Sequence, residues 1–382
     1  MKQLKGYPQN IQNQIVGKIK YYDGSFIYPS KTILISDRIP KIPFGINCIL
    51  TDKYIKGKYN VPTIDRIQSV ADLHNNDIVL IEKNGNINIV YEHGKDDNVL
   101  LMTERCNASC IMCPQHQESI NQGSYDLLNR QILALLPKEI KYLGITGGEP
   151  TLYKEHLIKY LSFIKDRLPN TVVALLTNGI LLEDINFVED ILEIGNSKLI
   201  FQIPLYSDID LIHNKIMGVA SYFRTIKGIY NLATYGQNIE IRVVVQKLNY
   251  ERLSSIARFI YRNMPFVAHV AFMAVELESL AKNNIEEIWV NPVDEIYQDE
   301  LYKGIKYLYN RNLEVSIYNL PLCLIKKEYW GFYKKSISSW KKVFSNKCNN
   351  CHNKENCGGF FKSTLYKMEK YIQPFTVEEV LC

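Results

Sequence analysis

The sequence contains no uninterrupted apolar run that approaches the length of a membrane-spanning helix. It also lacks an apolar signal region at its start, where Met1–Gly6 reads Met-Lys-Gln-Leu-Lys-Gly. These two absences predict a cytoplasmic protein without a membrane partner. Of its 382 residues, 46% are hydrophobic and 22% are charged, which is typical of a globular protein with room for two or three domains.

The chain has nine cysteines, an odd number, so they cannot all be paired in disulfides. The odd count and the absent signal region argue against the disulfide framework of a secreted protein. Seven cysteines fall into two groups with the spacing of metal sites. Cys48 and Cys382 lie outside these groups, and we interpret both as bystander thiols, with Cys382 as a reserve candidate for the second group.

Arginine is absent from the last part of the chain. Residues 321–382 hold eleven Lys, no Arg and five Glu, so the rest of a chain with a net charge of +5 is about neutral. A basic segment of this kind could attract an acidic peptide, an acidic electron donor or a phosphate backbone. The alternative, which we favour, is a solvated lysine-rich surface, and we expect no nucleic-acid partner.

The first cysteine group, Cys106-Asn-Ala-Ser-Cys110-Ile-Met-Cys113, follows the apolar run Val99–Met102. Three thiols in a loop at the end of a strand can surround one face of an iron–sulfur cube. Because a cube has four irons, one iron then lacks a protein ligand and is open to a substrate or cofactor. The alternatives are three reduced thiols or part of a zinc site. Gly147-Gly148-Glu149-Pro150, at the end of the next predicted strand, argues against both.

The second cysteine group lies near the end of the chain and consists of Cys323, Cys348, Cys351 and Cys357. Its C-x2-C-x5-C core and one distant cysteine offer four thiolates, enough to close every position of a second cube. A closed cluster can store or relay an electron, or hold a domain together. A four-cysteine zinc site has compatible spacing and remains the alternative. We favour iron and sulfur because the same chain already carries a cluster loop.

The hydrophobic pattern changes in character near residue 98. Residues 1–95 read mainly as short strands, and Asp77–Lys83 and Asn86–Tyr91 form a predicted hairpin around Asn84-Gly85, which can supply the positive φ angles of a two-residue turn. Beyond this point strands alternate with helices. The predicted strands are 99–103, 142–146, 171–176, 198–206, 239–246 and 267–275. The predicted helices are 124–136, 155–168, 181–192, 222–235, 250–262 and 295–309. Six such units predict a parallel sheet with right-handed crossovers.

Two features favour a barrel over a flat sheet. The candidate site residues fall mostly at the carboxyl ends of strands, where the active sites of barrels lie. The predicted strand 238–246 also places Glu240, Arg242 and Gln246 on one face, which suits a partly hydrated interior. We therefore predict an α/β fold with a partial (β/α)6 barrel at 96–315, a small β-rich domain at 1–95 and an auxiliary iron–sulfur domain at 316–382.

The CxxxCxxC loop after the first strand and the GGEP after the second resemble the radical S-adenosylmethionine (SAM) superfamily. In that family the open iron of a [4Fe-4S] cluster is chelated by SAM, and the reduced cluster cleaves SAM to a 5′-deoxyadenosyl radical. The resemblance implies that Gly147, Gly148 and Glu149 hold the amino group of SAM. It places Met112 beside the adenine, where the family commonly has an aromatic residue, and a thioether can also pack on a ring.

Three further polar residues are candidates for the SAM site. Asn178 ends the third predicted strand and Ser207 the fourth, so each is a candidate for ribose or methionine contacts, and each could equally cap the following helix. Arg242 faces the predicted interior and could hold the SAM carboxylate through two hydrogen bonds. Its alternative is an ion pair with Glu240 or another acid.

The C-terminal segment resembles the auxiliary-cluster domains, SPASM or its shortened twitch form, of peptide-modifying radical SAM enzymes. The longer form has more cysteines, so this chain supports one auxiliary cluster at most. Over nearly its full length the sequence resembles the His-Xaa-Ser system radical SAM maturases of the C type (HxsC). The shared segments are the opening GYPQNI, the CNASCIMCPQ loop, Pro321-Leu-Cys-Leu, Ser336-Ile-Ser-Ser-Trp-Lys and the closing CGGFF.

This resemblance implies a ribosomally made precursor peptide with His-Xaa-Ser repeats as the substrate. It also implies a second radical SAM maturase of the same system and an electron donor of the flavodoxin or ferredoxin type. One alternative is a radical SAM enzyme that acts on a nucleic acid or a small metabolite. An alternative of another class is a non-catalytic iron–sulfur or zinc-binding module.

Overall fold

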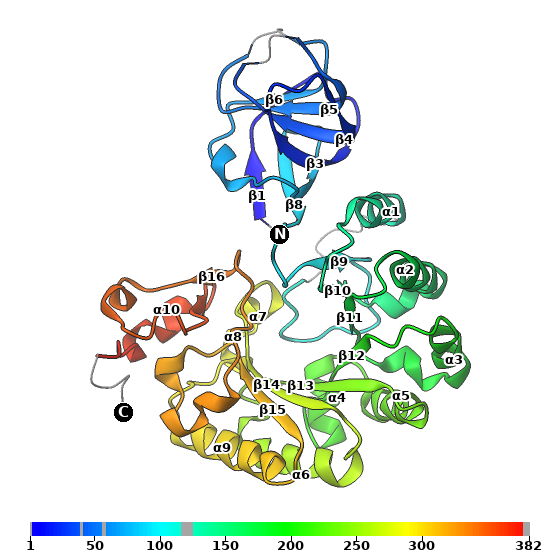
Figure 1. The fold of residues 1–382 in the computed structure, drawn as a ribbon. Coiled ribbons are helices and arrows are strands. Elements are labelled where there is room, and N and C mark those ends of the chain that lie inside the picture. The colour runs from blue at the N-terminus through cyan, green and yellow to red at the C-terminus, as the bar shows by residue number, and fades with distance from the viewer. Residues whose placement is uncertain (1, 39–40, 56–58, 116–124, 377–382) are drawn as a thin grey trace. The chain divides into compact units, whose positions relative to one another are not determined.

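A computed structural model describes residues 2–38, 41–55, 59–115 and 125–376 of the chain (Figure 1). The chain divides into two compact units. The first comprises residues 1–102, 123–145 and 162–172, and the second comprises residues 103–122, 146–161 and 173–382. Among the helices in the described ranges, none combines the length and the apolar content that a membrane crossing requires.

The first unit contains an eight-stranded sheet, which confirms the predicted β-rich N-terminal region. Its strands are β1 (Lys2–Lys5), β2 (Tyr7–Gln9), β3 (Ile15–Tyr21), β4 (Ile27–Ile35), β5 (Phe44–Leu50), β6 (Thr63–Asp65), β7 (Ile78–Ile81) and β8 (Asn86–Tyr91). Their order is β1-β8-β7-β3-β4-β5-β6-β2. β1 and β2 follow each other in the chain, yet they are the two edge strands of the sheet. Gly6, the one residue between them, therefore connects its two edges. A Cβ atom there would lie 2.7 Å from the carbonyl oxygen of Asp65, so the bend admits no side chain.

Strands β3 to β6 pair in parallel with their neighbours along the chain, an arrangement that was not predicted. Parallel strands usually need a long crossover connection. Here the chain coils instead, so that Ile19, Ile33 and Cys48 pack in one buried cluster. Burial raises the pKa of the Cys48 thiol to about 12. The side chain is therefore a packing element, which supports its interpretation as a bystander thiol.

The predicted hairpin is confirmed, but its turn differs from the predicted one. Strands β7 and β8 are antiparallel. Gly85 has a φ angle of 88°, and its N–H donates to the carbonyl oxygen of Glu82 at 3.0 Å. Asn84 does not have a positive φ angle. The loop is thus a turn closed by one left-handed glycine, and the prediction of a two-residue turn with two positive φ angles was wrong.

The second sheet has seven strands in the order β15-β14-β13-β12-β11-β10-β9. They are β9 (Val99–Leu101), β10 (Tyr142–Thr146), β11 (Val172–Leu176), β12 (Leu199–Pro204), β13 (Asn238–Val245), β14 (His269–Ala274) and β15 (Glu314–Tyr318). The pairs from β11 to β15 are all parallel, which confirms the α/β fold with a parallel sheet. All six predicted strands are present. The seventh, β15, was missed although buried Val315 and Ile317 alternate along it.

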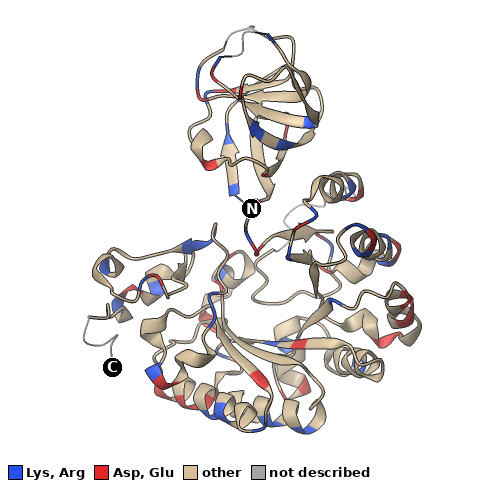
Figure 2. Cartoon of the chain, viewed as in Figure 1, with Lys and Arg blue, Asp and Glu red and all other residues tan. Residues whose placement is uncertain are grey.

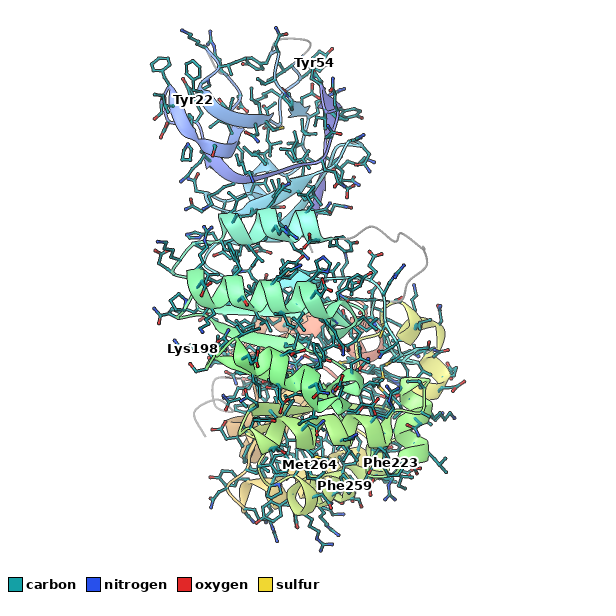
Figure 3. The ribbon with its side chains drawn as sticks, turned by 90° about the vertical axis from the view of Figure 1, so that its right-hand side faces the viewer. Tyr22, Tyr54, Lys198, Phe223, Phe259 and Met264 are labelled. Atoms are coloured by element: carbon teal, nitrogen blue, oxygen red, sulfur yellow. The ribbon has the colours of Figure 1, made fainter. Side chains whose placement is uncertain are left out.

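Each predicted helix is present. The helices are α1 (Asp126–Leu135), α2 (Lys154–Arg167), α3 (Ile185–Glu193), α4 (Asp210–Met217), α5 (Tyr222–Thr234), α6 (Leu253–Asn263), α7 (Leu280–Asn283), α8 (Ile285–Ile288), α9 (Glu295–Tyr309) and α10 (Leu365–Met368). Charged residues lie mainly on helices and loops, while strands β12 to β15 are mostly uncharged (Figure 2). The ring of the buried Tyr222 on α5 lies 5.2 Å from that of Phe223 and 6.2 Å from that of Phe259 on α6, and so joins the two helices. Phe223 and Phe259 are labelled in Figure 3.

Helix α4 was not predicted, and neither were the single-turn helices α7, α8 and α10. A sequence signal for α4 exists, because Gly218 follows its last residue with a φ angle of 66° and so ends the helix in the usual left-handed conformation. Its eight residues are too few for a clear apolar stripe.

Contacts at the end of β14 join the C-terminal segment to the rest of the second unit. Lys341 forms an ion pair of 2.7 Å with Glu276, and both side chains are largely shielded from solvent. The N–H of Leu277 donates to the hydroxyl of Thr364 at 3.3 Å. The segment also contains a small antiparallel pair, β16 (Lys342–Val343) and β17 (Phe360–Phe361). The domain boundaries at residues 95 and 315 stay predictions.

Candidate active site

One side of the Cys106–Cys113 loop is fixed to the end of helix α4. The N–H of Ser109 donates to the carbonyl oxygen of Met217 at 3.0 Å, and that of Ile111 donates to Ile216 at 3.0 Å. A Cβ atom on Gly218 would overlap the carbonyl oxygen of Ser109. A glycine after α4 is thus required twice, once by its positive φ angle and once by the close approach of the loop.

The other side of the loop is fixed by the segment that contains α7. The N–H of Leu280 donates to the carbonyl oxygen of Cys113 at 3.2 Å. The side-chain amide of Asn284 donates to the carbonyl oxygen of Ile111 at 2.8 Å. Within the loop, the N–H of Cys113 donates to the carbonyl oxygen of Cys110 at 3.0 Å. The loop is therefore held on two sides before any ligand binds.

The three thiols of this loop lie close enough to influence one another. Burial raises the pKa of Cys110 to about 12, and the charges of Cys113 and Cys106 raise it further. Burial also raises the pKa values of Cys106 and Cys113. Free thiolates are thus disfavoured here unless a cation compensates their charge. Among the described residues, no three His, Cys, Asp or Glu side chains are arranged as a ready-made site for a metal ion.

The GGEP loop packs directly against the backbone that leads into the thiol loop. Gly148 donates to the carbonyl oxygen of Thr103 at 2.8 Å, and Glu149 donates to that of Arg105 at 2.7 Å. A Cβ atom on Gly147 would lie 2.5 Å from the Thr103 oxygen, and one on Gly148 would overlap the Arg105 oxygen. The glycines are therefore required by contact between two protein loops. Their predicted contact with SAM stays a prediction.

Replacement of Gly148 by alanine should displace the thiol loop, because the added methyl group cannot fit against the backbone of Arg105. We expect a lower melting temperature and a loss of more than half of the iron bound by the thiol loop after anaerobic reconstitution. Gly331→Ala is the matched control, since a Cβ atom there meets nothing within 4 Å. Full iron content in both variants would show that the two loops do not need this contact.

The carboxylate of Glu149 is buried and accepts four hydrogen bonds from the protein. The donors are the N–H and hydroxyl of Thr151 at 3.0 and 2.6 Å, the hydroxyl of Thr177 at 2.6 Å and the N–H of Asn178 at 2.7 Å. Burial raises the pKa of Glu149, while these hydrogen bonds oppose the rise. The side chain thus joins the ends of β10 and β11. Thr177 was not predicted as a member of the site, and the SAM contact of Glu149 stays a prediction.

Asn178 connects the Glu149 network to the thiol loop. Its side-chain amide donates to the side-chain oxygen of Asn107 at 2.7 Å and lies 4.0 Å from the sulfur of Cys106. Its own oxygen accepts from the N–H of Ile180 at 3.0 Å, at the start of the following helical turn. The N-cap residue of that turn is Gly179, so Asn178 binds the turn from the position before the cap. The contact of Asn178 with the loop was not predicted, and its contact with ribose or methionine stays a prediction.

Ser207 is buried and holds the turn that precedes α4. Its hydroxyl accepts from the N–H of Ile209 at 3.1 Å. The next residue, Asp208, forms a two-bond ion pair with Arg252, with distances of 3.0 and 2.7 Å. The N-cap residue of α4 is Ile209, which has no side-chain cap, so the capping alternative for Ser207 is wrong. Its contact with ribose or methionine stays a prediction.

Arg242 belongs to a polar network that crosses three strands. Its Nε donates to Glu240 at 2.7 Å, so the ion-pair alternative is observed. The other oxygen of Glu240 lies 3.0 Å from Nδ1 of His269, and Nε2 of His269 lies 2.9 Å from the hydroxyl of Ser316. Burial opposes ionisation of Glu240, but His269 and Arg242 outweigh it and lower its pKa. The SAM-carboxylate contact of Arg242 stays a prediction.

Met112 lies in a buried apolar cluster beside the thiols, together with Tyr206 and Met217. Burial and the three thiol charges raise the pKa of Tyr206 far above its usual value. The side-chain amide of Gln246 donates to the Met112 sulfur at 2.9 Å. Gln246 is completely buried, and its Oε1 is one of the few buried side-chain atoms in the described ranges that lack a hydrogen-bond partner. An unpaired buried acceptor of this kind needs a donor from a ligand or from water.

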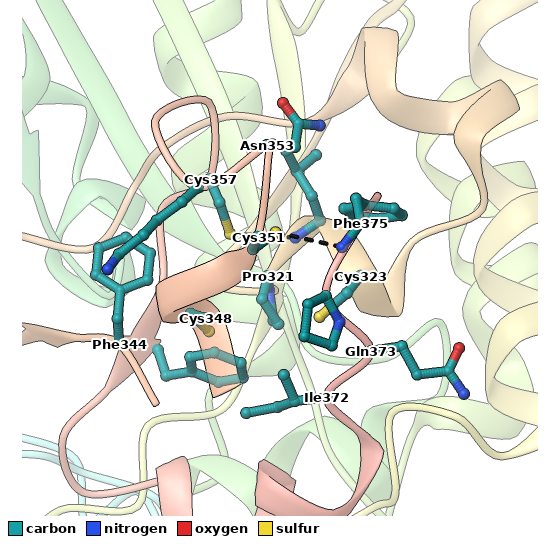
Figure 4. Close-up of a pocket in the computed structure, with 14 residues that line it drawn as sticks. Pro321, Cys323, Phe344, Cys348, Cys351, Asn353, Cys357, Ile372, Gln373 and Phe375 are labelled. Carbon is teal, nitrogen blue, oxygen red and sulfur yellow. Dashed lines mark hydrogen bonds between the residues drawn. The ribbon is translucent and has the colours of Figure 1, made fainter. Parts of the chain in front are cut away.

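The four cysteines of the second group line one cavity, as the spacing predicted. Cys323, Cys348, Cys351 and Cys357 turn their sulfurs toward the same space (Figure 4). Together with its open mouth, the cavity takes in about 320 Å³ that protein atoms leave empty, and its remaining walls are mostly apolar or aromatic. Burial and the charges of the other three thiols raise the pKa of Cys323 to about 12. As in the first loop, free thiolates are disfavoured without a cation.

Backbone N–H groups are directed at the sulfurs of this cavity. Cys357 accepts from the N–H of Leu322 at 3.5 Å and from that of Gly359 at 3.4 Å. Cys351 accepts from the N–H of Phe375 at 3.4 Å (Figure 4). Donors of this kind stabilise thiolates bound in iron–sulfur clusters. The chemistry of these donors suits a four-thiolate cluster, although the four described side chains are not arranged as a ready-made metal site.

Tyr333 adds a hydroxyl group to the same cavity wall. The N–H of Gly358 donates to the Tyr333 oxygen, which leaves the phenolic proton free to be donated. Burial, the charge of Cys357 and a hydrogen bond to Cys357 raise the pKa of Tyr333. The phenolic group thus lies beside Cys357, the thiol that already accepts from two backbone groups. Tyr333 was not predicted, because nothing in its local sequence connects it to the cysteines.

Comparison with known proteins found similarity over the central part of the chain. Residues 100–260 match the family model of the radical SAM superfamily. A GTP 3′,8-cyclase of Campylobacter jejuni is 26% identical over 231 residues, which cover 56% of this chain and 68% of the cyclase. A tungsten-containing aldehyde ferredoxin oxidoreductase cofactor-modifying protein of Pyrococcus furiosus is 28% identical over 172 residues, 42% of this chain and 47% of that protein.

Among solved structures, SuiB of Streptococcus suis bound to S-adenosylmethionine superposes with a TM-score of 0.45 and 19% identity, over 57% of this chain and 49% of SuiB. SuiB has also been solved with its precursor peptide SuiA, and that structure gives a TM-score of 0.43 and 17% identity, over 58% of this chain and 47% of SuiB. The chain thus spans about half the length of the SuiB chains that it matches.

Proposed function

We propose that this chain, whose residues 100–260 have the radical SAM fold, is a radical SAM enzyme that modifies a ribosomally made peptide. The observation that carries the proposal is the Cys106–Cys113 loop, which GGEP and α4 fix beside strand ends of the parallel sheet. When bound, a [4Fe-4S] cluster with one open iron would supply the electron that breaks the C5′–S bond of SAM, which gives methionine and a 5′-deoxyadenosyl radical able to abstract hydrogen.

The chain's own residues would hold SAM in a cradle around the three thiols. Gly147 and Gly148 would offer their backbone carbonyl oxygens, and Glu149 its carboxylate, to the amino group. Thr151 and Thr177 fix the position of that carboxylate. The unpaired Oε1 of Gln246 is an acceptor suited to an amino donor such as that of adenine. Asn178, Ser207, Arg242 and Met112 complete the proposed set.

The apolar cluster beside the thiols would exclude water from this cradle. Met112, Tyr206, Met217, Leu277 and Ala281 are all buried in it. A closed apolar wall keeps a reactive intermediate from solvent and from stray donors.

We propose a second, closed [4Fe-4S] cluster held by Cys323, Cys348, Cys351 and Cys357. The shared cavity and the N–H groups that point at Cys351 and Cys357 support it. Without an open iron this group cannot bind SAM, so its role is electron relay or structural support. A zinc ion is the alternative, and iron and acid-labile sulfide analysis of the purified chain separates the two.

Tyr333→Phe should make the midpoint potential of the second cluster more negative, because a hydrogen bond to a cluster thiolate stabilises the reduced form. Spectroscopically monitored redox titration measures the shift. Tyr329→Phe is the control, since that ring stacks on Tyr302 instead of contacting a thiol. An unchanged potential in Tyr333→Phe would contradict the hydrogen bond.

The substrate proposal rests on the resemblance of the sequence to the His-Xaa-Ser maturases. We propose a precursor peptide with His-Xaa-Ser repeats, a second radical SAM maturase as partner and a flavodoxin- or ferredoxin-type donor. The test is incubation of the reconstituted enzyme with such a peptide carrying deuterium on carbon. Deuterium in the 5′-deoxyadenosine, together with a mass change in the peptide, supports the proposal, whereas their joint absence with SAM cleavage intact would overturn the substrate.

A second candidate, action on a purine nucleotide, is favoured by the relatives named GTP 3′,8-cyclase. The same assay with GTP in place of the peptide discriminates between the two. GTP consumption that depends on SAM would favour the nucleotide.

A further inference from the structure

A groove outside the two thiol sites is open to solvent on the second unit. It encloses about 810 Å³, including its open mouth, and its lining consists of Trp289, Tyr366, Lys367, Glu369, Lys370 and Tyr371. Trp289 follows α8, and the other five residues belong to α10 and the short helical turn after it. No step of the proposed function yet uses this groove.

The walls of the groove are continuous with both thiol sites. Trp289 packs against the apolar cluster that contains Met112 and the partly buried Cys110. Tyr371, another lining residue, is followed directly in the chain by Ile372, which lines the cavity of the four cysteines. A ligand in the groove would therefore be adjacent to the wall of the proposed radical site.

The lining combines aromatic rings with positive charge. Tyr366 is 61% exposed, and the ammonium group of Lys370 lies 4.8 Å from the ring centre of Tyr371. The one acid, Glu369, accepts from the hydroxyl of Ser345 at 2.6 Å, and Lys347 donates to its backbone oxygen at 3.0 Å. Two lysines and one glutamate leave the lining with a net positive charge, beside apolar ring faces.

This chemistry fits an acidic peptide better than a nucleotide. Rings and lysines together complement carboxylates that alternate with apolar side chains. Phosphate is typically held by paired arginine contacts or by clustered backbone N–H groups in glycine-rich loops. The six lining residues include neither arginine nor glycine.

We propose that this groove binds an acidic segment of the peptide substrate and directs the rest of the peptide toward the Cys106–Cys113 loop. The proposal rests on the proposed peptide-modifying function and adds the docking surface that this function needs. The aromatic rings hold apolar side chains, and Lys367 and Lys370 hold carboxylates. Because both lysines are at the surface, their attraction is screened by salt, so binding should weaken as ionic strength rises.

Fluorescence anisotropy of the full-length reconstituted protein tests the groove, with a fluorescein-labelled peptide rich in Glu and Leu as the probe. A Lys- and Leu-rich peptide of the same length is the control ligand. Charge reversal by Lys367→Glu with Lys370→Glu should weaken binding of the acidic peptide roughly tenfold or more. Lys334→Glu with Lys362→Glu changes the net charge equally at exposed positions outside the lining and should leave binding nearly unchanged.

Trp289→Phe gives a second readout that does not depend on the charge changes. Binding of the unlabelled acidic peptide should alter the tryptophan fluorescence of the wild type, and most of this change should vanish in Trp289→Phe. If both charge-reversal pairs weaken peptide binding equally, or if Trp289→Phe keeps the fluorescence change, the assignment is overturned. It is also overturned if GTP binds instead of the peptide and the Lys367→Glu, Lys370→Glu pair weakens that binding. Failure of binding with 5′-deoxyadenosine formation intact overturns the groove alone, whereas intact binding without 5′-deoxyadenosine overturns the radical SAM proposal alone.

Discussion

Replacement of Cys113 by alanine abolishes 5′-deoxyadenosine formation and removes about half of the iron that the chain binds after anaerobic reconstitution. The loop offers three thiols for a cluster with one open iron, so the loss of one leaves too few ligands. Cys113 also ends the loop at the point where its carbonyl oxygen accepts from Leu280 at 3.2 Å. Alanine keeps this backbone contact, and the effect therefore isolates the thiol. Iron analysis and chromatographic quantification of 5′-deoxyadenosine measure both losses.

Cys48→Ala is the matched control for this variant. Cys48 is completely buried in the apolar cluster of the first unit, and it belongs to neither thiol group. The control should keep all of its iron and its SAM cleavage, although it should unfold at a somewhat lower temperature because a buried side chain is truncated. If Cys113→Ala binds as much iron as Cys48→Ala, the loop does not hold the cluster.

Replacement of Cys351 by alanine should remove the other half of the iron. It should also lower the melting temperature by several degrees, because a bound cluster stabilises the small segment that holds it. Dithionite-driven cleavage of SAM should persist, because the first loop keeps all three thiols. Modification of the peptide should be lost if the second cluster relays electrons and retained if it is only structural. Iron analysis, thermal unfolding and product analysis of one preparation distinguish these outcomes.

Cys382→Ala is the control for the second group. Cys382 was the reserve candidate for that group and lies outside the described residues. The cavity already contains four thiols without it, so this variant should keep all of its iron. Loss of iron in Cys382→Ala but not in Cys351→Ala would reassign the ligand set.

Local sequence patterns predicted the helices and strands whose apolar periodicity and end signals lie within the element itself. Strand Tyr142–Thr146 and helix Glu295–Tyr309 have the predicted bounds, because apolar periodicity and clear ends mark both. The coiled strands β3 to β6 were not predicted as parallel, since their pairing depends on residues far apart in the chain. Strand β15 was missed because it is short and follows a long helix.

In the candidate site, too, some features could be predicted from the sequence and others could not. Cysteine spacing and GGEP indicated which residues gather, and the second group does share one cavity. The partners of these residues could not be predicted, because they depend on how distant elements pack. Gln246 meets Met112, and Asn178 meets Asn107, only after the sheet and loop are assembled. Glu149 looked like a ligand-binding acid, yet the structure engages its carboxylate four times within the protein.

The central claim is that the Cys106–Cys113 loop supports reductive cleavage of SAM. The most direct measurement is anaerobic reconstitution of the full chain with iron and sulfide, addition of SAM and dithionite, and quantification of 5′-deoxyadenosine by mass spectrometry. The predicted result is 5′-deoxyadenosine that accumulates with wild type and is absent with Cys113→Ala. A chain that holds its full complement of iron but forms no 5′-deoxyadenosine, or forms it equally in both proteins, would contradict the claim.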